Sequence, residues 1–190
     1  PVAFDHRAGL LFGNGSYREA FDLHRELVRA APGEAIHEIR LSRALLAAGL
    51  GDEARKAAQH AAELAPSDAE AWDNLAWVLQ HDALGRRFAP GWDRGGAVAA
   101  YQKLFALDAT MDYSRADFAL MLERDAQGIR YGNPAGLEDA LAQYRLIKKP
   151  LKDLDLEENP VLDLMYLGRF ADMERAAAGL SDLHQREVFL

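Results

Sequence analysis

Small and apolar residues return along the chain at a fixed interval. Four positions each have a counterpart 34 residues further on: Gly15, Ala20, Leu27 and Pro32 are followed by Gly49, Ala54, Ala61 and Pro66. The glycine is typical of a helix end, where φ is often positive, and the proline of a residue that cannot continue a helix. The pattern therefore predicts pairs of helices, each of about 12 to 15 residues, which need stacking on neighbours for stability.

A third and a fourth unit follow with a longer interval. The segment 82–88 (DALGRRF) returns 43 residues later as 125–131 (DAQGIRY), and the same offset relates Leu79 to Leu122 and Tyr101 to Tyr144. This interval exceeds the earlier one by nine residues, so it predicts an insertion of nine residues between the two helices of each unit. The glycines and the proline in these insertions are typical of loops.

The interval of the first two units resembles the tetratricopeptide repeat, in which alanines such as Ala20 and Ala54 stand where two helices approach closely. The resemblance implies an all-α fold, a right-handed α-solenoid of antiparallel helix pairs. The elongated third and fourth units are also similar in length to the Sel1-like repeat. We therefore expect repeats over residues 1–34, 35–68, 69–111 and 112–149, followed by a different segment over 150–190.

The interval weakens in that last segment. Four carboxylates close together form an acidic connector: Asp153, Asp155, Glu157 and Glu158. Asn159 and Pro160 then predict a helix cap and a first helical turn. We interpret the remainder as a truncated C-terminal helix pair.

Composition narrows the choice of partner. The chain has no cysteine, which excludes disulfides and thiolate metal sites, and its formal net charge is −8 at pH 7. Negative charge disfavours nucleic acid and anionic membrane surfaces as partners. No apolar run approaches the roughly 18 residues of a membrane span, so we expect no membrane insertion.

The chain starts at Pro1 rather than at a methionine, so we expect further domains in a longer protein and leave the compartment open.

Residues capable of catalysis or metal binding are scattered. The six histidines show no pair at a metal-binding helical spacing, and Leu41 stands where the zinc-protease motif that His37 and Glu38 begin would need a second histidine. The abundant carboxylates are spread over helix faces and connectors rather than paired in a recognisable cleft. We therefore predict no metal, no cofactor and no enzymatic activity in this segment.

The resemblance also implies where a partner would bind. In tetratricopeptide arrays the first helices of successive repeats line a concave face that takes a peptide or a helix. Transferred by position, this face includes seven residues that we predict to bind a partner: Arg40, Arg43, Asp73, Asn74, Trp77, His81 and Asp117. Arrays that grip a C-terminal carboxylate need a lysine, whereas Ile39 and Asp73 stand at the matching positions here.

Two features of this face allow two interpretations each. If the Trp77 indole is exposed, packing gives no reason for its presence, and this favours a role in binding. Alternatively, Trp77 closes over the insertion of its own repeat. Arginine and aromatic residues in the insertions, at 86–88 and 130–131, are types enriched at binding hot spots. Alternatively the ring packs over its own helix pair while the arginine bonds helix-end carbonyls, or Asp82 and Asp125. Because the motif repeats within the array, we favour the structural interpretation.

Three functions are compatible with these patterns. The first is a protein–protein interaction scaffold that holds a peptide or a helix of another protein on its concave face. The second is an accessory repeat domain of a larger bacterial enzyme, for example one with a transglutaminase-like domain. The third is an architectural segment that self-associates through its end helices.

Overall fold

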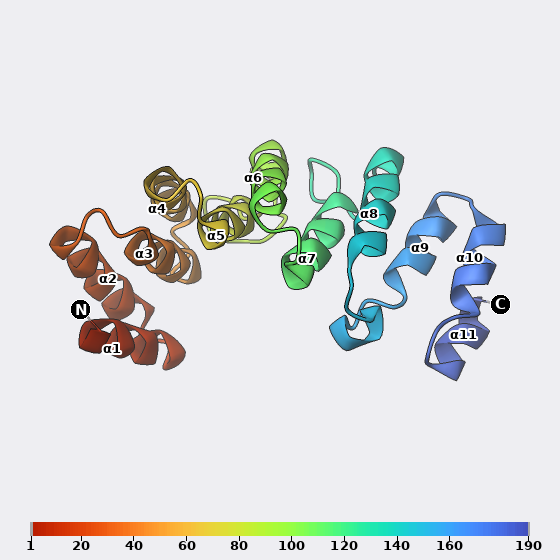
Figure 1. The fold of residues 1–190 in the computed structure, drawn as a ribbon, viewed down its shortest axis with the longest axis horizontal. Coiled ribbons are helices and arrows are strands. Elements are labelled where there is room, and N and C mark those ends of the chain that lie inside the picture. The colour runs from red at the N-terminus through yellow and green to blue at the C-terminus, as the bar shows by residue number, and fades with distance from the viewer. Residues whose placement is uncertain (1, 190) are drawn as a thin grey trace. The chain divides into compact units, whose positions relative to one another are not determined.

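A computed structural model describes the backbone of residues 2–189 and the side chains of residues 7–189. The chain divides into two compact units, Pro1–Ala109 and Thr110–Leu190. Each unit consists of helices that follow one another as antiparallel neighbours (Figure 1). Within residues 2–189 no β-strand forms, and no helix combines the length and apolar character that crossing a membrane requires.

The first unit contains three helix pairs. In chain order its helices are α1 (Val2–Gly13), α2 (Tyr17–Ala30), α3 (Ala35–Ala47), α4 (Gly51–Leu64), α5 (Ala69–Leu79) and α6 (Arg94–Leu107). Each helix packs against the next one along the chain, and α3 also packs against α5. The contact between α3 and α5 joins the first helices of two successive pairs, as in a helical solenoid.

Short turns join the helices of the first two pairs because glycine permits the backbone that they need. Gly15 and Gly49 have φ values of 79° and 78°. After each glycine the next backbone N–H reaches back over the end of the helix, from Ser16 to the Leu11 carbonyl and from Leu50 to the Leu45 carbonyl. The glycines therefore end the first helices in the way that their sequence positions predict.

The second helices pack through alanine. Ala20, Ala54, Ala58 and Ala61 are fully buried, so the helix backbones approach closely with no large side chain between them. Such a seam buries little area per residue, and each pair depends on its neighbours for stability. The predicted burial of Ala20 and Ala54 is confirmed.

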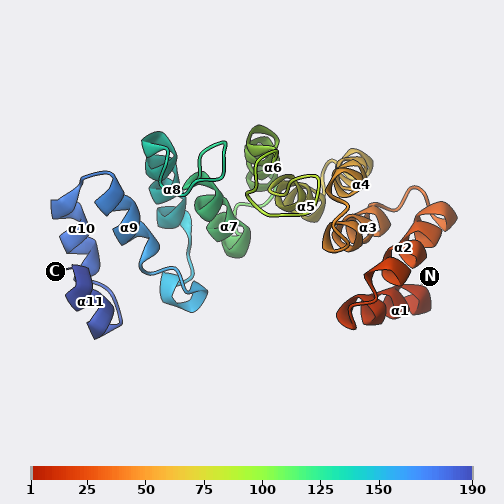
Figure 2. The ribbon, with the colours of Figure 1, turned by 180° about the vertical axis from the view of Figure 1, so that it is seen from behind.

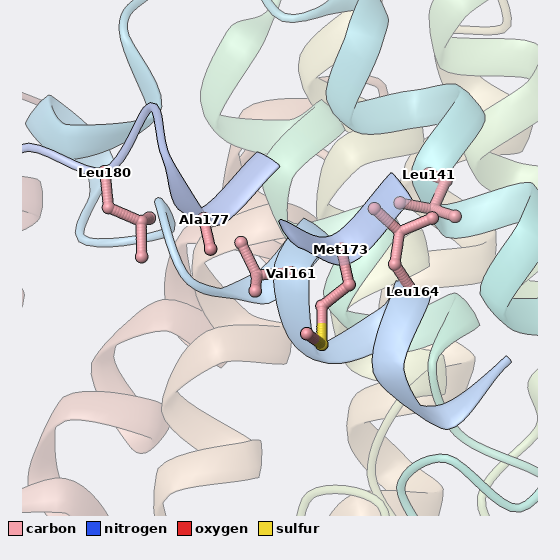
Figure 3. Packing of buried hydrophobic residues seen from close by; sticks show 6 residues of the cluster. All are labelled: Leu141, Val161, Leu164, Met173, Ala177 and Leu180. Atoms are coloured by element: carbon pink, nitrogen blue, oxygen red, sulfur yellow. The ribbon is translucent and has the colours of Figure 1, made fainter. Parts of the chain in front are cut away.

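The second unit contains two helix pairs and a short terminal helix. Its elements are α7 (Asp112–Leu122), α8 (Pro134–Leu146), the 3₁₀ helix η1 (Leu151–Leu154), α9 (Asn159–Tyr166), α10 (Phe170–Ala177) and α11 (Leu183–Phe189). One core cluster of this unit comes from α8, α9, α10 and the short segment after α10 (Figure 3): Leu141, Val161, Leu164, Met173, Ala177 and Leu180. This cluster explains how α9 and α10, of eight residues each, remain helical.

The predicted all-α fold of tetratricopeptide-like helix pairs is confirmed. Each of the first four predicted repeats contains one helix pair. The predicted acidic connector after the fourth repeat begins with η1. The connectors inside the third and fourth pairs cover residues 80–93 and 123–133, and Figure 2 shows them as open loops beside their own helices. The proposed division into repeats is an assignment by sequence interval, and it stays a prediction.

Candidate partner-binding surface

Two of the predicted residues, Arg43 and Asn74, meet where α3 packs against α5. Arg43 Nε donates to the amide oxygen of Asn74 at 3.0 Å, and Asn74 Nδ2 donates to the Ser42 hydroxyl at 2.8 Å. Ser42 donates in turn to the Ile39 carbonyl at 2.7 Å. Because the buried amide is bonded through both its oxygen and its nitrogen, the burial of this polar group is compensated.

Asn74 and Arg43 differ in what they offer to a partner. Asn74 is only 2% exposed, so a partner cannot contact it directly. It contributes to the surface by holding Arg43 in place. The Arg43 side chain is half exposed and lies 3.5 Å from the Glu70 carboxylate. An exposed pair of this kind contributes little to stability, which leaves the guanidinium able to exchange partners.

Trp77 is the largest exposed apolar group among the predicted residues. Its side chain is 37% exposed, and the guanidinium carbon of Arg87 lies 4.2 Å from the centre of its ring. The ring of His81 meets it edge-on at 5.1 Å, and His81 Nδ1 lies 2.9 Å from the Trp77 carbonyl. The arrangement therefore agrees in part with each interpretation of Trp77. The insertion covers one part of the indole, and another part faces solvent.

The other predicted residues are distributed over both units. Arg40 on α3 and Asp73 on α5 are half-buried, and His81, directly after α5, is buried. Asp117 is half-buried on α7 in the second unit. Six of the seven predicted residues thus come from α3, α5 and the first residues after α5.

The connector of the third repeat is an ordered turn around Asp82. Asp82 Oδ1 accepts from the backbone N–H groups of Leu84 and Arg86, and Oδ2 accepts from Arg86 Nε at 2.7 Å. The bonds from Arg86 hold the pKa of the Asp82 carboxyl below its usual value. Phe88 follows at φ 55° and donates its N–H to the Gln80 carbonyl. The predicted pairing of arginine with Asp82 is present.

The connector of the fourth repeat has the same backbone. Asp125 Oδ1 accepts from the N–H groups of Gln127 and Ile129, and Tyr131 at φ 64° donates to the Glu123 carbonyl. The arginine behaves differently from our expectation, since Arg130 Nε bonds Glu123 Oε2 at 2.6 Å rather than Asp125. The equivalent of Arg86 here is Ile129, so Asp125 lacks the neighbouring cation.

Two buried polar residues at the base of these connectors were missed by the sequence analysis. Gln80 is fully buried, and its amide oxygen accepts from Arg87 at 2.6 and 2.9 Å. Glu123, also fully buried, takes the same place in the fourth repeat. The interval of 43 residues aligns Gln80 with Glu123 and Arg87 with Arg130, so the signal was available. The connectors are therefore built into their own repeats, which agrees with the structural interpretation.

A cluster of polar groups surrounds Glu123. Asn159 Nδ2 donates to Glu123 Oε1 at 3.1 Å, so Asn159 does not cap α9 as predicted, and Glu158 precedes the helix instead. Asp163 on α9 is fully buried, and neither of its carboxylate oxygens finds a hydrogen bond within residues 7–189. Burial, together with the negative charge of Glu123, raises the pKa of Asp163 to about 8.

Comparison with known families gives one match. Residues 11–78 match the family model of the tetratricopeptide repeat. This match supports tetratricopeptide repeats over residues 11–78, and such repeats generally mediate protein–protein interactions. No curated protein matches the chain.

The tetratricopeptide match covers the part of the chain that holds most of the predicted surface. It extends from α1 to the last turn of α5, and it includes Arg40, Arg43, Asp73, Asn74 and Trp77. It ends before the connector of the third repeat, so the likeness of the elongated repeats to the Sel1-like family stays a prediction. Among residues 7–189, no three side chains of histidine, aspartate or glutamate are grouped to hold a metal ion.

Proposed function

We propose that the surface formed by α3 and α5 binds a peptide or a helix from another protein, with Trp77 as its central anchor. The observation that carries this proposal is the half-exposed indole held between Arg87 and His81. Binding to a ring that is already immobilised loses less side-chain entropy than binding to a mobile one. Tryptophan and arginine are also the residue types that contribute most at interfaces.

The charges around the indole define the partner further. Arg43 is exposed and bonded to Asn74, and its salt bridge to Glu70 can be replaced by a carboxylate of the ligand. Asp73 lies on the same helix as Trp77, so the surface carries both signs of charge. We propose a ligand that places an apolar side chain on the indole and an acidic side chain on Arg43.

A binding experiment with matched variants tests this function. The wild-type segment and its Trp77→Ala and Arg40→Ala/Arg43→Ala variants are immobilised and incubated with native lysate, and the retained proteins are identified. We expect a retained protein that both variants lose, with affinity reduced about tenfold or more for Trp77→Ala. The control is Leu84→Ala, which removes an exposed apolar side chain from the connector of the same repeat.

The outcomes separate the competing functions. Retention that is indifferent to both variants would refute the proposed surface and favour an accessory role in a larger enzyme. Retention of the chain itself, with a mass that rises with concentration, would favour an architectural role instead. Circular dichroism of each variant shows whether a loss of binding comes from unfolding, because Trp77 also contacts its own repeat.

A further inference from the structure

A groove of ≈ 500 Å³ opens in the second unit, among α8, η1, α9 and α10. Its apolar lining comes mainly from aliphatic side chains on these elements: Leu141, Leu151, Pro160, Leu164 and Ala176. Leu141 and Leu164 also belong to the core cluster, where Figure 3 shows them next to each other. The floor of the groove is therefore fixed by the packing that holds the unit together.

Three arginines line the same groove. Arg145 comes from α8, Arg169 stands at the start of α10, and Arg175 lies within α10. Asp172 is the one carboxylate in the lining, and it accepts from Arg169 Nε at 2.8 Å and pairs with Arg175. Arg169 also pairs with Glu138 at 3.0 Å. Even with Glu138 counted, positive charge exceeds negative charge here, in a chain whose net charge is −8.

The electrostatics of Asp172 reflect this excess. Its pKa lies below the usual value because Arg169 bonds it, with further contributions from the charges of Arg175 and Arg145. Arg145 is exposed and pairs with no carboxylate within residues 7–189. The groove thus has an apolar floor and a cationic rim with capacity for one more carboxylate.

We propose that this groove binds an acidic segment of a partner protein, with a leucine-like side chain on the floor and a carboxylate between Arg145 and Arg175. Charge complementarity selects this occupant, because arginine pairs with carboxylates through two parallel hydrogen bonds. The groove uses α8 and α10, the second helices of their pairs, together with α9. It is therefore a different surface from the one around Trp77, and it does not depend on the function proposed there.

The probe is a short acetylated, dye-labelled peptide made of glutamate and leucine, with binding followed by fluorescence anisotropy at low salt. One matched peptide replaces glutamate by glutamine, and another replaces leucine by serine. Binding by the first peptide, with at least about tenfold weaker binding by each of the others, is the expected result. Equal binding of the glutamine peptide would overturn the proposal, since it would show that the arginines play no part.

Variants assign the binding to the groove. Arg145→Ala and Arg175→Ala should each weaken the acidic peptide about five- to tenfold, and Ala176→Leu, which narrows the groove and keeps its charge, should weaken it too. Arg29→Ala, at an exposed arginine of the first unit, should leave the affinity unchanged. Loss of affinity in Arg29→Ala as well would show attraction to the chain as a whole and refute the site. Circular dichroism confirms that each variant is folded.

A second copy of the chain is the alternative occupant, because its own acidic connector combines leucine with aspartate and glutamate. Sedimentation of the wild-type chain distinguishes this occupant from a segment of another protein. A wild-type chain that remains monomeric while it binds the acidic peptide supports the proposal. Self-association that Arg145→Ala and Arg175→Ala abolish would replace the proposed partner by a second copy and overturn the assignment.

Discussion

The hydroxyl of Tyr144 donates to Glu123 Oε1 at 2.6 Å, and both side chains are buried. At the equivalent place in the third repeat, Gln80 Nε2 lies 2.8 Å from the hydroxyl of Tyr101. The two repeats therefore share one arrangement, in which a polar residue after the first helix joins a tyrosine of the second helix to the connector. They differ in charge, because the fourth repeat places a carboxylate where the third has an amide.

This difference predicts unequal effects of removing the two tyrosine hydroxyls. Tyr144→Phe takes one donor from a buried carboxylate and should lower the free energy of unfolding by about 2–3 kcal/mol, whereas Tyr101→Phe should lower it by about 1 kcal/mol. Urea unfolding followed by circular dichroism measures both. Each variant is the matched control of the other, and equal losses would show that the charge of Glu123 is not what the hydroxyl stabilises.

The buried Asp163 predicts how stability changes with pH. Its pKa is about 8 in the folded chain and near 3.8 in the unfolded chain, so between these values the folded state holds a proton that the unfolded state has released. The contribution of Asp163 to the free energy of unfolding therefore falls as pH rises from about 4 to 8 and is constant above that. Asp163→Asn should remove this slope.

The same variant should be more stable than wild type at pH 8, by about 1–3 kcal/mol, because a buried charge without a hydrogen bond is replaced by a neutral group. The matched control is Asp153→Asn, at an exposed aspartate of the acidic connector. Thermal unfolding between pH 4 and pH 9 measures all three chains. Parallel pH profiles for wild type and Asp163→Asn would contradict the prediction, because they would mean that folding leaves the pKa of Asp163 unchanged.

The regular part of the fold was predictable because its determinants are local. Gly15 and Gly49 end helices through their own backbone conformation, and Ala20 and Ala54 mark close helix contacts at a constant interval. The Asp82 turn was also partly predictable, since its bonds reach only two to four residues along the chain.

The polar interior could not be predicted in the same way. Gln80 and Glu123 are polar residues at helix ends, where sequence patterns place solvent-exposed side chains. Their burial depends on tyrosines 21 residues away, and for Glu123 also on Asn159 a further helix along. Such partners are decided by tertiary packing, whereas the local sequence around Asn159 predicts only a helix cap. For the candidate surface, position in the repeat predicts Arg43 and Asn74 as binding residues, which stays a prediction. It does not predict that Asn74 is buried and bonded to Arg43.

The connector of the third repeat makes a last prediction, because it rests on the turn between α3 and α4. Gly51 donates its N–H to the Ala83 carbonyl at 2.9 Å, and a Cβ atom at Gly51 would lie 2.0 Å from the Asp82 carbonyl oxygen. Backbone cannot give way as a flexible side chain does, so Gly51→Ala must displace the connector. We expect a loss of about 1–3 kcal/mol in the free energy of unfolding.

Displacing the connector should also alter the environment of Trp77, since Arg87 reaches its ring from the same segment. A shift in tryptophan fluorescence of folded Gly51→Ala would report this change. Gly33→Ala is the matched control, because a Cβ atom there meets nothing within 4 Å and the backbone φ is not positive. If Gly51→Ala keeps the stability and the fluorescence of Gly33→Ala, the connector does not rest on this turn, and the ordered position of Arg87 over Trp77 needs another cause.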